Sequence, residues 1–149
     1  MPVHYPESKL ENAVKAIYEA SNNVSVSNTY TCWNADNPDL PALTFIVAQS
    51  EAQQGQDGAT GNWTCNLEIS VVTHIEDTSG ETHIEYEGEM RDECFYDDVM
   101  QRVNQAAATL GEPITIMIWK PTKFVRQMDE GRRVSTQTVE VFLAPDSLP

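Results

Sequence analysis

Two histidines stand in the same short motif, and they are the first residues whose type and spacing could bind a metal. His74 and His83 are each the second residue of a Thr-His-Ile-Glu tetrapeptide, and the carboxylates Glu76, Asp77 and Glu87 stand nearby. Metal centres usually take their ligands from short fixed spacings, such as His-Glu-x-x-His or paired Cys-x-x-Cys. Neither spacing occurs in this chain. We therefore expect no metal site, and we expect both histidines to be solvated, at a strand end and at a helix start.

The cysteines are the next candidates, because a thiolate can act as a nucleophile. Cys65 falls on the apolar face of a predicted strand, and Cys94 follows Asp92 and Glu93, whose negative charges raise the pKa of a thiol. A catalytic cysteine needs a lowered pKa and a nearby base, so we expect neither residue to be catalytic. With Cys32 the cysteines are odd in number and widely spaced, which favours a reducing, intracellular environment.

Three glycines repeat at intervals of three residues, as glycines do in some phosphate-binding loops. Such loops lead directly into a helix, and the P-loop ends in Lys-Ser or Lys-Thr. The run of Gly55, Gly58 and Gly61 leads into a predicted strand instead and contains Asp57. We therefore expect a flexible loop and no nucleotide cofactor.

Charged residues are segregated along the chain. Residues 76–98 hold ten acidic side chains and one arginine, a net charge of −9, whereas residues 120–133 hold five basic and two acidic side chains, a net charge of +3. Unlike patches could join one copy of the chain to the next, although scattered surface charge fits the pattern equally well. The candidate interface residues are Glu85, Glu89, Asp92, Glu93, Lys120, Lys123, Arg126, Arg132 and Arg133.

The first half of the chain predicts one helix and three strands. Apolar residues recur at the spacing of an amphipathic helix over residues 7–22. Period-two alternation or short apolar runs predict strands at residues 24–33, 43–48 and 63–74. Between the last two strands, the polar residues 49–61 predict a mobile loop.

The second half predicts two helical segments, at residues 84–94 and 99–110, with a cap at Thr78, Ser79 or Gly80 and a stop at Gly111. A strand at residues 114–119 follows, and then a hairpin whose arms, 124–128 and 134–143, flank Asp129-Glu130-Gly131. We expect a frayed tail at residues 144–149. The order is α-β-β-β-α-α-β-β-β, without strand–helix alternation. It predicts an α+β fold in a single domain of residues 1–149, with a mainly antiparallel sheet and helices on one face.

The bulk charge narrows the classes of partner. The chain has nine Lys and Arg residues and 23 Asp and Glu residues, which gives a net charge of −14. This charge repels both DNA phosphates and anionic membranes. No apolar run approaches the ~20 residues of a membrane span, and residues 1–10 lack the pattern of a signal peptide. We therefore expect an intracellular protein that does not bind a membrane or a duplex.

Several segments of the second half resemble a known family. They are Gly61-Asn62-Trp63, the strand Cys65-Asn66-Leu67-Glu68-Ile69-Ser70-Val71, an acidic helical segment ending in Asp98-Val99-Met100, and the run from Asp129-Glu130-Gly131 to Val139-Glu140-Val141. In these segments, and in a short helix ahead of the sheet, the chain resembles the tail terminators and related tail-completion or neck proteins of tailed bacteriophages. The resemblance covers most of the chain in layout and residues 61–143 in pattern.

This resemblance implies a structural virion protein of the tail or neck, assembled in the host cytoplasm. The family forms a hexameric ring that stops polymerisation of the tail tube and joins the tail to the head connector. The implied partners are further copies of the chain, the tail tube protein and a connector or stopper protein, with DNA only passing through the lumen. The resemblance implies no catalytic residue, no enzymatic activity and no cofactor.

The long polar loop and the acidic middle depart from the family pattern and leave open whether the ring is the terminator or a neighbouring connector. Two other classes remain open. One is a small-ligand-binding α+β domain, whose pocket a sequence cannot reveal. The other is a small hydrolase, which lacks a recognisable pairing of nucleophile and base in this chain.

Overall fold

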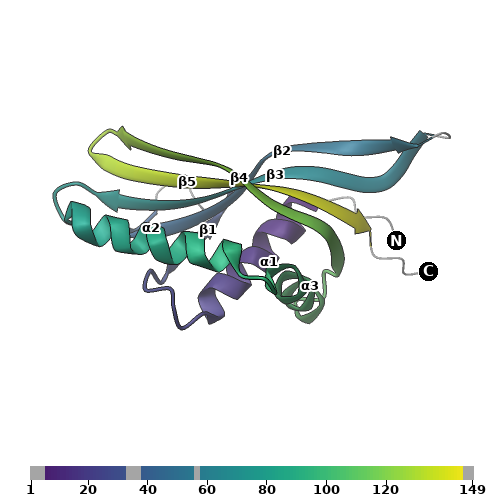
Figure 1. Cartoon of the computed structure of the whole chain (residues 1–149), viewed down its shortest axis with the longest axis horizontal. Helices are drawn as coiled ribbons and strands as arrows, with labels where there is room; N and C mark the ends of the chain where they lie inside the picture. The colour runs from purple at the N-terminus through teal and green to yellow at the C-terminus, as the bar shows by residue number, and fades with distance from the viewer. Residues whose placement is uncertain (1–5, 33–37, 56–57, 146–149) are drawn as a thin grey trace.

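The computed structural model describes residues 6–32, 38–55 and 58–145, and within these ranges three helices pack against one five-stranded sheet (Figure 1). The helices are α1 (Pro6–Ala20), α2 (Gly80–Phe95) and α3 (Val99–Thr109). The strands are β1 (Asn28–Thr31), β2 (Ala42–Gly55), β3 (Gly58–His74), β4 (Ile114–Asp129) and β5 (Arg132–Pro145). Their order in the sheet is β1-β2-β3-β5-β4. Only the β1–β2 pair among them is parallel. The predicted α+β class, with a mainly antiparallel sheet, is confirmed.

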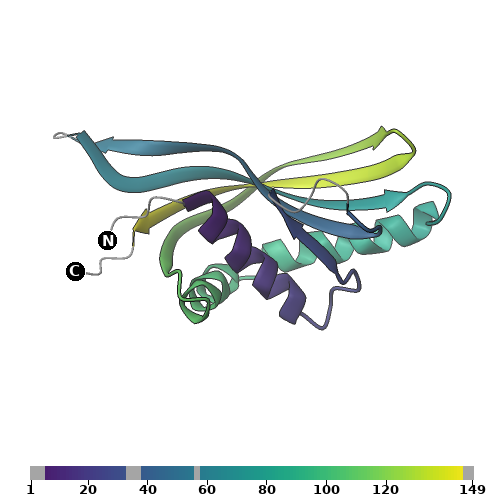
Figure 2. The same ribbon diagram turned by 180° about the vertical axis from the view of Figure 1, so that it is seen from behind.

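All three helices lie on one side of the sheet, and the views from front and back agree on this (Figures 1 and 2). Strand alternation explains the arrangement, because side chains two residues apart point to the same face. On β3 the helix-facing side chains Cys65, Leu67, Ile69 and Val71 are completely buried. They meet Val139, Val141 and Leu143 of β5 in the core.

Helix α1 follows its predicted stripe, and the side chains of that stripe are all buried: Leu10, Ala13, Val14, Ile17 and Tyr18. Tyr18 packs edge-on against Phe45, with 5.1 Å between the ring centroids. The carboxylate of Glu11, also buried, accepts hydrogen bonds from the backbone N–H of Val47 at 2.8 Å and of Cys32 at 3.4 Å. Burial raises the pKa of Glu11, and these two bonds oppose that shift. A buried carboxylate thus fixes α1 to the sheet.

Two predicted turns and caps are confirmed. Ser79 caps α2, since its side-chain oxygen accepts a hydrogen bond from the N–H of Thr82 at 3.1 Å. The β4–β5 turn places Glu130 and Gly131 at positive φ angles of 50° and 80°, as a two-residue hairpin with right-handed strand twist requires. Gly111 follows α3 at a φ of 75°.

The loop predicted at residues 49–61 was wrong over the part that the structure describes. Residues 49–55 continue β2 and residues 58–61 begin β3, while residues 56 and 57 lie outside the described ranges. The ladder pairs Ser50 with Cys65 and Ala52 with Trp63. Polar residues form strands readily where the backbone ladder satisfies their N–H and C=O groups. The mobility of this segment stays a prediction.

The strands predicted at 114–119 and 124–128 are one strand, β4, with a register shift between Pro121 and Phe124. Proline cannot donate to a ladder, and it is tolerated here because β4 is an edge strand. Of the predicted frayed tail, residues 144 and 145 belong to β5, and residues 146–149 lie outside the described ranges. The observed order is therefore α-β-β-β-α-α-β-β.

Candidate functional site

A groove of about 430 Å³ lies between α2 and the β4–β5 hairpin. Its aliphatic side chains are Ile84 of α2, Met128 of β4 and Val134 of β5. Ile84 is 56% exposed and Met128 is 70% exposed. Arg126 and Arg133 also line the groove. Glu87 lines it too and its carboxylate is paired with Arg126, so the groove combines an apolar surface with a small excess of positive charge.

A continuous chain of polar side chains forms the floor of this groove. Thr73 Oγ1 lies 2.8 Å from Nδ1 of His83, and Nε2 of His83 lies 2.8 Å from Oγ of Ser135. Ser135 donates to Glu87 at 2.6 Å, and Arg126 Nε donates to the same carboxylate at 2.9 Å. The side chains of Thr73, His83, Ser135 and Glu87 are buried, whereas Arg126 is exposed. The floor is thus held by hydrogen bonds from β3, α2, β5 and β4.

Counting protons fixes the direction of each bond. Ser135 has one hydroxyl proton and gives it to Glu87, so Nε2 of His83 must donate to Ser135. Nδ1 of the neutral imidazole then accepts the hydroxyl proton of Thr73. Burial lowers the pKa of His83. Burial alone would raise the pKa of Glu87, but hydrogen bonds from Arg126 and Ser135 hold it below its usual value.

This network contains the residue types of a Ser-His-Glu triad, but not its geometry. In a triad the imidazole accepts the proton of the serine, and the carboxylate orients the imidazole. Here the imidazole donates to Ser135, and Glu87 bonds to the serine itself. Ser135 is also only 1% exposed. The network is suited to holding α2 on the sheet, and it does not present a nucleophile.

The two histidines differ more than their identical motifs predict. His83 is buried in the groove floor, so the expectation that it is solvated was wrong. His74 is partly exposed, accepts a hydrogen bond from the N–H of Glu76 at 3.2 Å, and lies 3.8 Å from Asp77. Among the described residues no three His, Cys, Asp or Glu side chains lie together in a way that could hold a metal.

Several of the predicted interface charges have partners within the chain. Glu93 is fully buried and paired with Arg102 at 2.6 Å, so it is not part of the surface and this candidate was wrong. Arg126 is paired with Glu87. Glu89 accepts hydrogen bonds from the backbone and side chain of Ser25 at 3.1 and 2.9 Å.

The remaining candidates keep charge at or near the surface. Arg133 donates from Nη1 to the carbonyl oxygen of Thr78, and Arg132 is partly exposed beside it in the hairpin. The other exposed candidates are Glu85, Asp92, Lys120 and Lys123. The segregation of charge seen in the sequence is therefore partly neutralised where α2 packs beside the β4–β5 hairpin.

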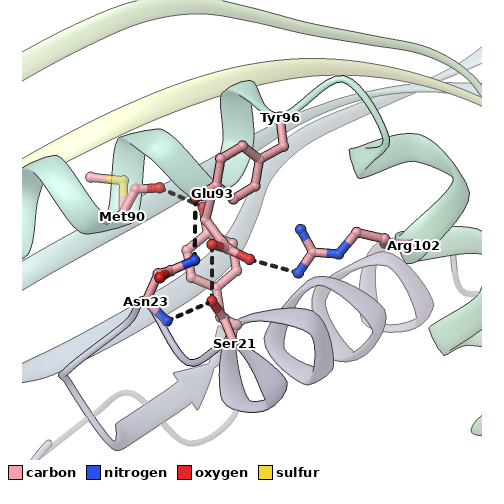
Figure 3. Close-up of polar contacts among 7 residues, drawn as sticks. Ser21, Asn23, Met90, Glu93, Tyr96 and Arg102 are labelled. Atoms are coloured by element: carbon pink, nitrogen blue, oxygen red, sulfur yellow. Dashed lines mark hydrogen bonds and ion pairs between the residues drawn. The ribbon is translucent and has the colours of Figure 1, made fainter.

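The corner where α2 meets α3 is a second structured surface, and Figure 3 shows its polar contacts. Ser21 donates to Glu93 at 3.0 Å, opposite the ion pair with Arg102. Tyr96 accepts from the side chain of Asn23 at 3.3 Å, and its ring lies 5.9 Å from the Arg102 guanidinium. Between these anchored residues Phe95 is 55% exposed.

The groove is not predictable from the local sequence, although one signal for it is present. Ser135 and Gln137 occupy the apolar phase of β5, two positions apart and ahead of Val139. Polar residues in that phase are buried and need partners. Ser135 finds its partners, His83 and Glu87, only through packing between segments about 50 residues apart in the chain. Gln137 donates to the carbonyl oxygens of Lys123 and Thr138.

Comparison with protein-family models and with curated proteins found no match. No described helix is long and apolar enough to span a membrane.

Proposed function

We propose that this protein is a structural subunit whose copies join head to tail into a ring, with the role of the phage tail terminators that its sequence resembles. The ring, a hexamer in that family, would cap a tail tube and dock it to the head connector. One structural feature carries the proposal, namely the long edge strand β4 and its exposed apolar side chains.

Strand β4 runs for 16 residues along one edge of the sheet. Its exposed apolar side chains are Met117, Ile118, Val125 and Met128. Lysines, prolines and register shifts protect an edge strand from pairing with other chains. The middle of β4 has all three, at Lys120, Pro121 and Lys123, and the exposed apolar side chains lie on either side of this protected stretch. Exposed apolar side chains gathered along such an edge support a role in assembly.

Charge along β4 disfavours a two-fold contact centred on the middle of the strand. Antiparallel pairing of β4 with itself about Lys123 would place Lys120 opposite Arg126 and Lys123 opposite its own copy. Like charges directly opposite each other destabilise a strand pair. A head-to-tail contact avoids this repulsion, and it produces a ring when its rotation closes.

Sedimentation velocity over a concentration series tests the proposal. We expect a species several-fold heavier than the 16.7 kDa chain. Replacing Ile118 by Ser should weaken the assembly. Replacing Leu110 by Ser should not, although both side chains are 49% exposed, because Leu110 lies at the end of α3, away from β4. A 16.7 kDa monomer at every concentration up to the solubility limit would overturn the proposal.

The groove favours a small-ligand-binding domain as a second candidate. Its volume of about 430 Å³ lies within the ~300–1,000 Å³ of typical ligand sites, and its aliphatic lining and arginines suit an aliphatic carboxylate. Octanoate offers a simple probe. A rise in melting temperature with octanoate that Ile84→Glu abolishes would favour this candidate.

A further inference from the structure

We propose that the corner formed by Phe95, Tyr96, Asp97 and Asp98 in one copy binds in the groove of the next copy. Phe95 packs between Ile84 and Met128, and the carboxylates of Asp97 and Asp98 face the guanidinium groups of Arg126 and Arg133. This inference rests on the proposed function, since it names what the next copy places against the Met128 end of β4.

The corner holds Phe95 in solvent by fixing its neighbours. Cys94 is completely buried, and its carbonyl oxygen accepts a hydrogen bond from Trp119 Nε1 at 2.8 Å. On the other side, the hydroxyl of Tyr96 accepts from Asn23 (Figure 3). An aromatic side chain between two anchored residues loses little conformational entropy on binding, which is a property of interface hot spots.

The groove is equally well ordered before binding. His83, Ser135 and Glu87 bond to one another beneath it, so the floor needs no rearrangement to accept a side chain. Ile84 and Met128 are more than half exposed. Covering them with an aromatic ring removes apolar surface from water on both sides of the contact.

The charges of the two surfaces are complementary. The corner carries two exposed carboxylates, Asp97 and Asp98. In the groove Arg126 is paired with Glu87, whereas Arg133 bonds to a backbone carbonyl and keeps its charge uncompensated. Complementary charge at the rim of a contact fixes its register and excludes wrong partners. The acidic corner and the basic side of the groove therefore attract each other when they belong to different copies.

A single copy cannot make this contact with itself. Phe95 follows Ile84 by 11 residues of α2, which is ~16 Å along a helix axis and close to three full turns. The corner and groove therefore lie at opposite ends of one side of α2. A two-fold contact that placed each Phe95 beside Ile84 of the other copy would make the two α2 helices antiparallel. It would bring the exposed Glu81 of each copy towards the exposed Asp98 of the other. Like charge therefore favours the head-to-tail arrangement.

Mixing two variants tests the contact. Phe95→Ser removes the corner's side chain, and Ile84→Glu places a charge in the groove, each at an exposed position where the fold should hold. We expect each variant alone to need at least a tenfold higher concentration to assemble. An equimolar mixture should form a complex of two copies, since one intact corner then meets one intact groove. Leu110→Ser is the matched control and should assemble like the wild type.

Each outcome decides between the inference and the proposed function. If the wild type assembles and Phe95→Ser assembles equally well, the corner–groove contact is wrong while the ring proposal survives. The inference also fails if the mixture stays monomeric with both variants melting like the wild type. A wild-type species no larger than a dimer contradicts the head-to-tail geometry. A wild type that is monomeric throughout overturns both proposals.

Discussion

Glu93 of α2 and Arg102 of α3 form an ion pair, with 2.6 Å between their atoms, in which the carboxylate is buried and the guanidinium reaches solvent. Ser21 donates a further hydrogen bond to the same carboxylate, so residues from three segments meet there (Figure 3). The pair fixes the turn that joins the two helices and so supports the corner that exposes Phe95.

Arg102→Ala should destabilise the protein strongly. Removing one partner of a buried pair leaves an uncompensated charge, which typically costs ~3–5 kcal/mol. Urea denaturation followed by circular dichroism measures the change in the free energy of unfolding. The control is Lys15→Ala, which breaks the exposed pair with Glu19 and should cost ~0–1 kcal/mol. Equal losses in the two variants would contradict the structural importance of the buried pair.

Stability should fall as pH is lowered from 7 towards 5, in part through His83. Burial lowers the pKa of His83 in the folded state, so the unfolded chain binds a proton first as pH drops below ~6.5. His83→Gln removes this contribution and should flatten the dependence of unfolding free energy on pH in that window. If the slopes of His83→Gln and the wild type coincide, His83 does not titrate as described.

One of the three thiols should react in the folded protein. Cys65 and Cys94 are completely buried, and burial raises the pKa of each to about 12, whereas Cys32 is exposed. Only a thiolate attacks a disulfide reagent. Ellman's reagent should therefore titrate one thiol in buffer and three in denaturant, and none in folded Cys32→Ser. Rapid reaction of a second thiol would show that Cys65 or Cys94 is more accessible than the structure indicates.

Reversing Arg132 and Arg133 to Glu should block assembly and leave the monomer folded. Both residues lie in the hairpin beside the groove, and reversal places negative charge where we propose that Asp97 and Asp98 bind. The double variant Lys9→Glu with Lys15→Glu changes the net charge equally on α1 and is the control. Sedimentation velocity and melting temperature separate assembly from folding. Assembly at wild-type concentrations would exclude this hairpin from the contact.

The sequence by itself determined the elements whose signal is local. The stripe from Leu10 to Tyr18 has the period of a helix, and the alternation from Cys65 to Val71 has the period of a strand, so both were predictable from neighbours in the chain. The same holds for the Ser79 cap and the turn at Glu130 and Gly131. These features depend on the chemistry of a few adjacent residues.

Tertiary structure decided two features. One is the strand conformation of residues 49–55 and 58–61, and the other is the groove. The polar sequence of these residues predicts a loop, yet their backbone groups find partners across the β2–β3 ladder. The two Thr-His-Ile-Glu motifs are locally the same, but only His83 meets Ser135, which is 52 residues away. A charged or polar side chain is buried where a distant partner compensates its lost hydration. Such a partner is present only once the segments have packed together. For this reason the sequence alone does not distinguish the charged residues that stay at the surface from those that are buried.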